Sequence, residues 1–189
     1  MFKDLVSRNR SYRRFDESHA ISRDTLLELV DLARQTASAA NKQPLRYILS
    51  SDAPRNAVVF SHLAWAGYLP DWPGPEAGER PTGYVIMLGD KETAPEVAYD
   101  HGIAAQTILL GAVEKGLGGC MIASVSRAGL RKALAIPERY EILLVIALGK
   151  PVETVVMDPI GPDGDVKYWR DGNRVHHVPK RRLEDIVLG

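Results

Sequence analysis

The chain has 189 residues and carries 24 basic and 24 acidic side chains. This length fits one domain with a sizeable core, and the zero net charge gives no overall attraction to nucleic acid or to an anionic membrane. Cys120 is the single cysteine, which excludes an internal disulfide framework, and residues 1–10 are charged where a secretory signal would be apolar. We therefore expect a cytoplasmic protein.

The first half of the chain alternates helices, strands and loops. Phe2, Leu5 and Val6 share one helical face, and Ser22 is a suitable N-cap for a second helix. The elements expected in chain order are a helix that ends ahead of Asn9, an extended basic segment 11–15, a helix 22–36, a loop 37–45, a strand 46–51, a helix 56–66 and a loop 70–83.

The second half continues this alternation up to residue 151. The expected strands are 84–89, 119–123 and 142–148, and the expected helices are 98–115 and 127–135. The longer helix is apolar nearly all round, so it should lie inside the protein. Its apolar stretch falls well short of the roughly 20 residues of a membrane span. The alternation favours a layered fold. Residues 151–189 are predicted to form a polar, extended arm on a single domain of residues 1–189.

Familiar side-chain catalysts are absent from the sequence. It contains no metal-ligand spacing, no nucleophile elbow and no phosphate-binding P-loop. His176 and His177 are adjacent in a strand-like segment, so their rings should point to opposite faces and not share a metal. We expect them to be a solvated pair in the arm. Cys120 lies in an apolar strand and is expected to be a buried, neutral thiol.

Two basic segments are suited to binding an anion. Residues 8–15 hold four arginines, and guanidinium groups match phosphate oxygens in pairs. Residues 180–182 form a second basic cluster near the end of the chain. The alternative for both segments is a solvated basic stretch without a ligand.

Two further segments are suited to binding a planar ring. Residues 36–44 combine small side chains with Asn41 and Gln43, whose amides can both donate to and accept from a pyrimidine-like ring edge. Residues 116–124 form a glycine turn and a short strand, whose end could direct backbone N–H groups at a ligand. The alternative for both is an ordinary connection.

Taken in order, these segments resemble motifs of the nitroreductase family. Residues 10–15 (RSYRRF) resemble its Arg-Ser-x-Arg-x-Phe signature, and residues 38–44 (SAANKQP) resemble its Ser-x-x-Asn-x-Gln-Pro motif. Residues 102–106 with 116–118 resemble the central helix and the following turn, and residues 180–183 (KRRL) resemble the closing Lys-x-Arg-Leu. The resemblance spans nearly the whole chain.

This resemblance implies an α+β fold: a three-layer sandwich with a central, mainly antiparallel sheet and an extended C-terminal arm. It also implies a homodimer with shared active sites, FMN as cofactor and NADH or NADPH as co-substrate. Side chains of one chain would hold the FMN phosphate and the N1–O2 pole of the flavin, a loop of the partner subunit would cover it, and a strand end would meet N5. The residues at these three places are, in turn, Arg10, Ser11, Arg13, Lys180 and Arg182; Ala37, Ser38, Ala39 and Asn41; and Ile122, Ala123 and Ser124.

The resemblance further implies an oxidoreductase that passes hydride from NAD(P)H through flavin N5 to a small organic acceptor, such as a nitroaromatic or a quinone, by a ping-pong mechanism. We expect no metal and no catalytic side chain, because the flavin carries the chemistry and the backbone of Ala123 tunes it. Trp65, Tyr68 and Trp72 either line the acceptor site or close the core under the loop.

Two other classes of function stay open. One is a flavin- or nucleotide-binding sensor or storage module without turnover. The other is a nucleic-acid-binding module built on residues 8–14, against which the zero net charge argues.

Overall fold

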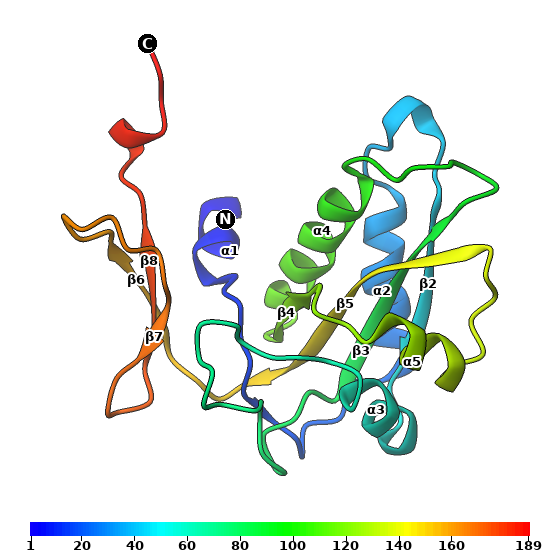
Figure 1. The fold of residues 1–189 in the computed structure, drawn as a ribbon, viewed down its shortest axis with the longest axis horizontal. Coiled ribbons are helices and arrows are strands. Elements are labelled where there is room, and N and C mark those ends of the chain that lie inside the picture. The colour runs from blue at the N-terminus through cyan, green and yellow to red at the C-terminus, as the bar shows by residue number, and fades with distance from the viewer.

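A computed structural model describes residues 1–189 as a central sheet between helices, with a smaller sheet at one side (Figure 1). The helices are α1 (Phe2–Arg8), α2 (Arg23–Arg34), α3 (Ala53–Phe60), α4 (Asp100–Glu114) and α5 (Arg127–Ala133). The strands are β1 (Phe15–Asp16), β2 (Leu45–Ser50), β3 (Gly83–Asp90), β4 (Gly118–Ile122), β5 (Tyr140–Pro151), β6 (Val155–Pro159), β7 (Trp169–Arg170) and β8 (His176–Lys180). No helix is both long and apolar enough to cross a membrane.

β5 is the central strand of the main sheet. One of its edges pairs with β3, which pairs in turn with β2, and its other edge pairs with β4. β1 pairs with the last two residues of β5, and every pairing in this sheet is antiparallel. All eight residues of β3 are buried, as a continuous apolar run bounded by turn residues requires.

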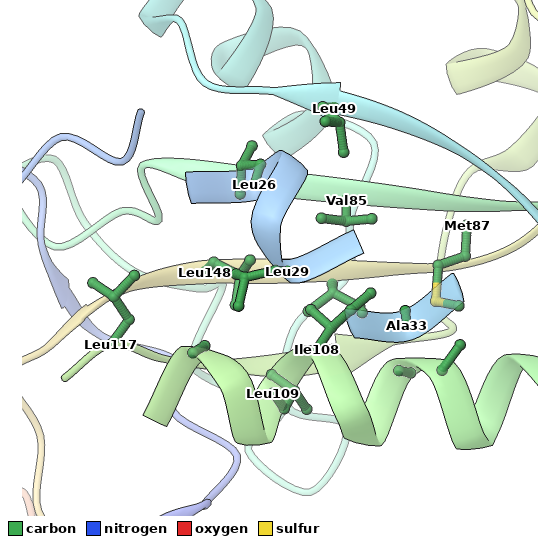
Figure 2. Packing of buried hydrophobic residues seen from close by; sticks show 14 of the residues in the cluster. Leu26, Leu29, Ala33, Leu49, Val85, Met87, Ile108, Leu109, Leu117 and Leu148 are labelled. Carbon is green, nitrogen blue, oxygen red and sulfur yellow. The ribbon is translucent and has the colours of Figure 1, made fainter. Parts of the chain in front are cut away.

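The α2 and α4 helices cover one face of the sheet (Figure 2). Leu26 and Leu29 of α2 and Ile108 of α4 are completely buried there. The two helices approach closely at Gly111, where a Cβ atom would lie 2.8 Å from Cδ1 of Leu32. Small residues in α4 therefore allow the contact that the sequence predicts.

The other face of the sheet is covered by α3 and α5. Val59 of α3 and Leu130 of α5 are completely buried in a second cluster with Tyr84 and Ile86 of β3. Helices thus lie on both sides of an antiparallel sheet, and the predicted three-layer α+β fold is confirmed.

Two helices differ from their sequence predictions. α3 begins before residue 56 because the Asp52 side chain accepts from the N–H of Arg55 and Pro54 fits the first turn. α4 is buried on one side only: Ile103 is 40% exposed, and Tyr99 just ahead of the helix is 80% exposed. The expectation that this helix lies wholly inside is therefore wrong for the single chain.

The arm forms its own three-stranded sheet, in which β8 pairs with β6 in parallel and with β7 antiparallel. His176 in β8 is completely buried, and the ring of His177 stacks on Trp169 with centroids 4.0 Å apart. Nδ1 of His177 lies 2.7 Å from a carboxylate oxygen of Asp158. The expectation of a solvated histidine pair is therefore wrong, because both rings pack within the arm.

Candidate functional site

A first cavity, of about 250 Å³, lies between the segment that follows α1 and the arm strands β6 and β8. Arg10, Arg13 and Lys180 bring three cations to its lining, and Ser11 brings a hydroxyl. Among the ion pairs of the chain, none involves these three cations. The remaining lining residues are Asn9, Val155, Tyr168, His176 and Val178. Unpaired cations that converge on one small cavity suit a phosphate group.

Arg10 has a donor that the protein leaves unused. One end of its guanidinium donates to the carbonyl oxygen of Val6 at 2.7 Å, whereas its Nε is buried without a partner. Leaving such a donor unpaired costs about 1–3 kcal/mol. Because Arg10 lines the cavity, the unpaired donor favours a ligand acceptor for this residue.

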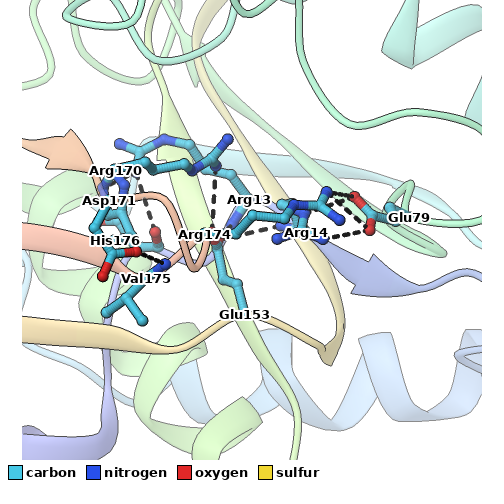
Figure 3. A network of polar contacts seen from close by, with 10 residues as sticks. Arg13, Arg14, Glu79, Glu153, Arg170, Asp171, Arg174, Val175 and His176 are labelled. Atoms are coloured by element: carbon cyan, nitrogen blue, oxygen red, sulfur yellow. Dashed lines mark hydrogen bonds and ion pairs between the residues drawn. The ribbon is translucent and has the colours of Figure 1, made fainter.

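The other two arginines of the basic segment are engaged elsewhere. Arg8 pairs with Asp4 on the exposed surface of α1. The buried Arg14 forms an ion pair with Glu79, which also lies 3.2 Å from Arg174. The Arg14 hydrogen bond lowers the pKa of Glu79, and this pair belongs to the network in Figure 3. Only Arg10 and Arg13 of the four predicted arginines therefore face the cavity.

Glu153 fixes Arg13 from the other side of the network (Figure 3). Its side chain is completely buried. It accepts from the backbone N–H groups of Arg13 and Arg14 and from the guanidinium of Arg170 at 3.2 Å. Because Glu153 binds the backbone of Arg13, the guanidinium of Arg13 has no carboxylate partner and remains available to a ligand.

A second cavity, of about 200 Å³, lies at the C-terminal end of β4. It is lined by Met121, Ile122, Ala123 and Ser124, by Ala64, Trp65, Ala66 and Gly67, and by Arg13 and Tyr168. Ala123 and Ser124 are exposed, and their backbone N–H groups donate to no acceptor in the protein. The strand end therefore presents two free donors, those of Ala123 and Ser124, to this cavity.

Arg13 and Tyr168 line both cavities, so the cavities meet at these two residues. The Arg13 guanidinium lies 4.8 Å from the centre of the Tyr168 ring. The Tyr168 hydroxyl accepts from the N–H of Tyr68 at 3.3 Å, and the two tyrosine rings are 4.9 Å apart. A ligand that reached from one cavity to the other would pass Arg13 and Tyr168.

The small-residue loop 37–43 lies apart from both cavities, at the far end of the sheet from the arm (Figure 1). The Ser38 hydroxyl donates to the buried Asp100 and accepts from the N–H of Gln43, and Ala39 N–H donates to Asp100 at 3.0 Å. Ala40, Asn41 and Gln43 have φ of 49°, 53° and 51°. Such left-handed residues cost about 1–3 kcal/mol each and are often found at functional sites.

The family model described as Nitroreductase family matches residues 6–150. The chain belongs to the nitroreductase family. It is therefore an oxidoreductase, and the arm from residue 151 onward lies outside the matched segment. YodC of Bacillus subtilis, provisionally named an NAD(P)H nitroreductase, is 24% identical over 200 residues, which cover 88% of this chain and 97% of YodC.

Solved nitroreductases share the fold, and two of them also match the arm. A Desulfovibrio desulfuricans structure described as a nitroreductase in complex with FMN aligns with a TM-score of 0.71 at 21% identity, over 100% of this chain and 95% of that one. A nitroreductase family protein of Clostridium difficile aligns with a TM-score of 0.68 at 16% identity, over 98% of this chain and 95% of that one.

This nitroreductase-family chain brings together four of the five residues predicted to hold the phosphate. Arg10, Ser11, Arg13 and Lys180 line the first cavity. The Arg182 side chain is 67% exposed, lies 3.9 Å from Glu184 and does not line it. The predicted loop residues Ala37, Ser38, Ala39 and Asn41 lie elsewhere in the same chain.

The aromatic candidates for the acceptor site divide into three cases. Trp65 is 8% exposed in the core and also lines the second cavity. Trp72 packs against the same core under the guanidinium of Arg170, whereas Tyr68 is 49% exposed.

Cys120 is 2% exposed, and burial raises its pKa to about 12, so the predicted buried, neutral thiol is confirmed.

The sequence patterns do not single out Tyr168, Glu153 or Asp100, and they place His176 in a solvated pair. Each is a single polar or aromatic residue in a polar stretch, so it adds nothing to a periodic pattern. Their importance depends on contacts between segments far apart in the chain, such as the Glu153–Arg13 contact across 140 residues.

Proposed function

We propose that this chain binds FMN and passes hydride from NADH or NADPH to a small organic acceptor, such as a nitroaromatic or a quinone, by a ping-pong mechanism. The observation that carries this proposal is the pair of joined cavities, one with unpaired cations and the other with free backbone donors. The FMN in the Desulfovibrio desulfuricans structure and the NAD(P)H in the name of YodC support it.

The donor set fits the parts of FMN. Arg10, Ser11 and Lys180 would hold the phosphate, and Arg13 at the junction would favour negative charge on the N1–O2 pole of the ring. The N–H of Ala123 would meet N5. FMN, when bound, supplies the position that accepts and donates hydride. The sequence has no glycine fingerprint for an adenosine moiety, so we propose FMN in place of FAD.

The partner subunit would complete each site. We propose a homodimer in which Ala37, Ser38, Ala39 and Asn41 of one chain cover the flavin held by the other. The separation of this loop from the two cavities supports this arrangement, as do exposed apolar side chains, which mark interfaces. The exposed fractions are 71% for Phe2, 80% for Tyr99, 40% for Ile103, 71% for Leu183, 59% for Ile186 and 93% for Leu188.

Cofactor binding and turnover test the proposed chemistry. Purified protein reconstituted with FMN should be yellow and should oxidise NADH or NADPH only when a quinone or nitroaromatic acceptor is present. Arg10→Ala should weaken FMN binding about 10- to 150-fold, since a hydrogen bond to a charged group is worth about 1.5–3 kcal/mol. Arg8→Ala, an exposed arginine outside both cavities, is the matched control. FMN binding without acceptor-dependent oxidation would favour the sensor or storage alternative.

Complementation tests the shared site. A chain with Arg10→Ala and a chain with Asn41→Ala would each form defective homodimers. In a heterodimer, one of the two sites would contain neither change. Co-expressed chains should therefore recover flavin and turnover that neither parent has. A stable, flavin-loaded, active monomer would contradict the homodimer.

A further inference from the structure

His176 is a buried residue in the lining of the first cavity. The proposed function gives it no role. It lies in β8, its exposed fraction is 0%, and its backbone N–H donates to the carbonyl oxygen of Thr154. Its Nε2 lies 3.2 Å from Nη1 of Arg13, and its ring centre lies 5.1 Å from that of Tyr168. Its Nδ1 is buried and has no partner in the protein.

The contact with Arg13 decides where the ring hydrogen lies. A guanidinium can only donate, so Nε2 accepts from Arg13 and the hydrogen of the neutral ring is on Nδ1. Burial and the cations Arg13 and Arg170 lower the pKa of His176 to about 4. Glu153, the buried carboxylate of the same network, is bound to Arg170 and to backbone N–H groups. His176 therefore carries an N–H donor for which the protein provides no acceptor.

We propose that His176 is a binding residue of the phosphate cavity, in which its Nδ1–H donates to a phosphate oxygen of the bound cofactor while its Nε2 holds the guanidinium of Arg13. The proposal rests on the proposed binding of FMN. Arg10 and Lys180 already bring charge to this cavity. A neutral donor adds a hydrogen bond without repelling Arg13, which a protonated ring would do.

Two substitutions separate the two contacts of the ring. His176→Gln can place an amide oxygen near the position of Nε2, which keeps an acceptor for Arg13 and removes the Nδ1–H donor. His176→Asn can place an amide N–H near the position of Nδ1, which keeps the donor and removes the acceptor. His177→Gln is the matched control, because His177 is the next residue of β8 and does not line the cavity.

The measurement is the Kd of each apo variant for FMN and for riboflavin, which lacks the phosphate, by quenching of flavin fluorescence. His176→Gln should weaken FMN binding about 10- to 150-fold and change riboflavin binding less than about 3-fold. His176→Asn should weaken both ligands to a similar, smaller extent, because Arg13 lies at the junction of the cavities. The control should resemble the wild type.

Three results would overturn the proposal. They are unchanged FMN affinity in His176→Gln, an equal loss for FMN and riboflavin in that variant, and a wild-type chain that binds no FMN. Only the last also removes the proposed function. If His176→Gln fails to fold, ¹⁵N-histidine NMR of the wild type decides: an Nδ1–H tautomer whose Nδ1 resonance shifts with FMN but not with riboflavin supports the proposal, and an Nε2–H tautomer or an unshifted Nδ1 overturns it.

Discussion

Replacing Glu153 tests how the arm is fixed to the rest of the chain. Its buried carboxylate accepts from the N–H groups of Arg13 and Arg14 and pairs with Arg170, whose side chain is 16% exposed. In Glu153→Ala the cation of Arg170 would stay buried without a counter-ion and two N–H groups would lose their acceptor. Breaking a buried ion pair from one side costs about 3–5 kcal/mol, so we expect the free energy of unfolding to fall by about that amount.

Urea unfolding followed by circular dichroism measures this loss. Glu141→Ala, an exposed residue of β5 without an ion pair, is the matched control and should change the free energy of unfolding by less than about 0.5 kcal/mol. Glu153→Gln keeps an acceptor for the two N–H groups and should lose about half as much as Glu153→Ala. Adding Arg170→Met to Glu153→Ala should recover part of the loss, because the unpaired charge is removed. A loss below about 1 kcal/mol in Glu153→Ala, or no recovery in the double variant, would refute this account.

Three further predictions concern His176, Gly119 and Asp100. The folded pKa of His176 is about 4, below the ordinary 6.5, so between these pH values the unfolded chain binds more protons than the folded one. The neutral His176 therefore contributes about 2–3 kcal/mol to the free energy of unfolding. This contribution is complete above pH 6.5 and is lost as the pH falls toward 4. Unfolding midpoints should therefore fall less over this range in His176→Gln than in the wild type, and parallel profiles would contradict it. Gly119→Ala should lower the free energy of unfolding by about 3 kcal/mol, because its Cβ would lie 2.2 Å from the carbonyl oxygen of Ala147. The control is Gly172→Ala, whose Cβ would meet no atom within 4 Å. Equal stability of the two variants would show that the strand can shift. Asp100→Asn should speed amide hydrogen exchange in residues 39–43, because Ser38 and Ala39 lose a charged acceptor. Asp31→Asn, at an exposed helix position, is the control and should leave this exchange unchanged. Unchanged exchange in Asp100→Asn would mean that the loop holds its conformation without the carboxylate.

The sequence predicts the fold well where one face or one run of residues is strongly apolar. The strand β3 is such a run, and its prediction over 84–89 lies within the observed Gly83–Asp90. The sequence predicts the bounds of an element less well where polar contacts determine its start and end. The helix expected at 56–66 is shifted to Ala53–Phe60. Asp52 caps its start, and beyond its end Leu63 forms a β-bridge with Val125 while Ala64 N–H donates to the carbonyl oxygen of Ser124.

The candidate site also has a part that the sequence predicts and a part that it does not. Arg10, Arg13 and Lys180 are found from the sequence because they lie in short basic segments, and all three line the first cavity. The partners that decide which cations remain free are not predictable from local pattern. Glu153 and His176 meet Arg13 only after the arm folds back on the segment that follows α1, across 140 and 163 residues of sequence.

The distribution of charge around the first cavity argues for a small anion rather than for nucleic acid. Three of the six cations of this region are paired with two carboxylates: the half-buried Glu79 takes Arg14 and Arg174, and the buried Glu153 takes Arg170. The surplus is Arg10, Arg13 and Lys180, which converge on about 250 Å³. Nucleic acid is bound by cations that follow a surface and meet successive phosphates, whereas these three can meet only one group. A chain with zero net charge thus has a local excess of positive charge. A single dianion would neutralise most of it, and a neutral His176 keeps that excess from growing.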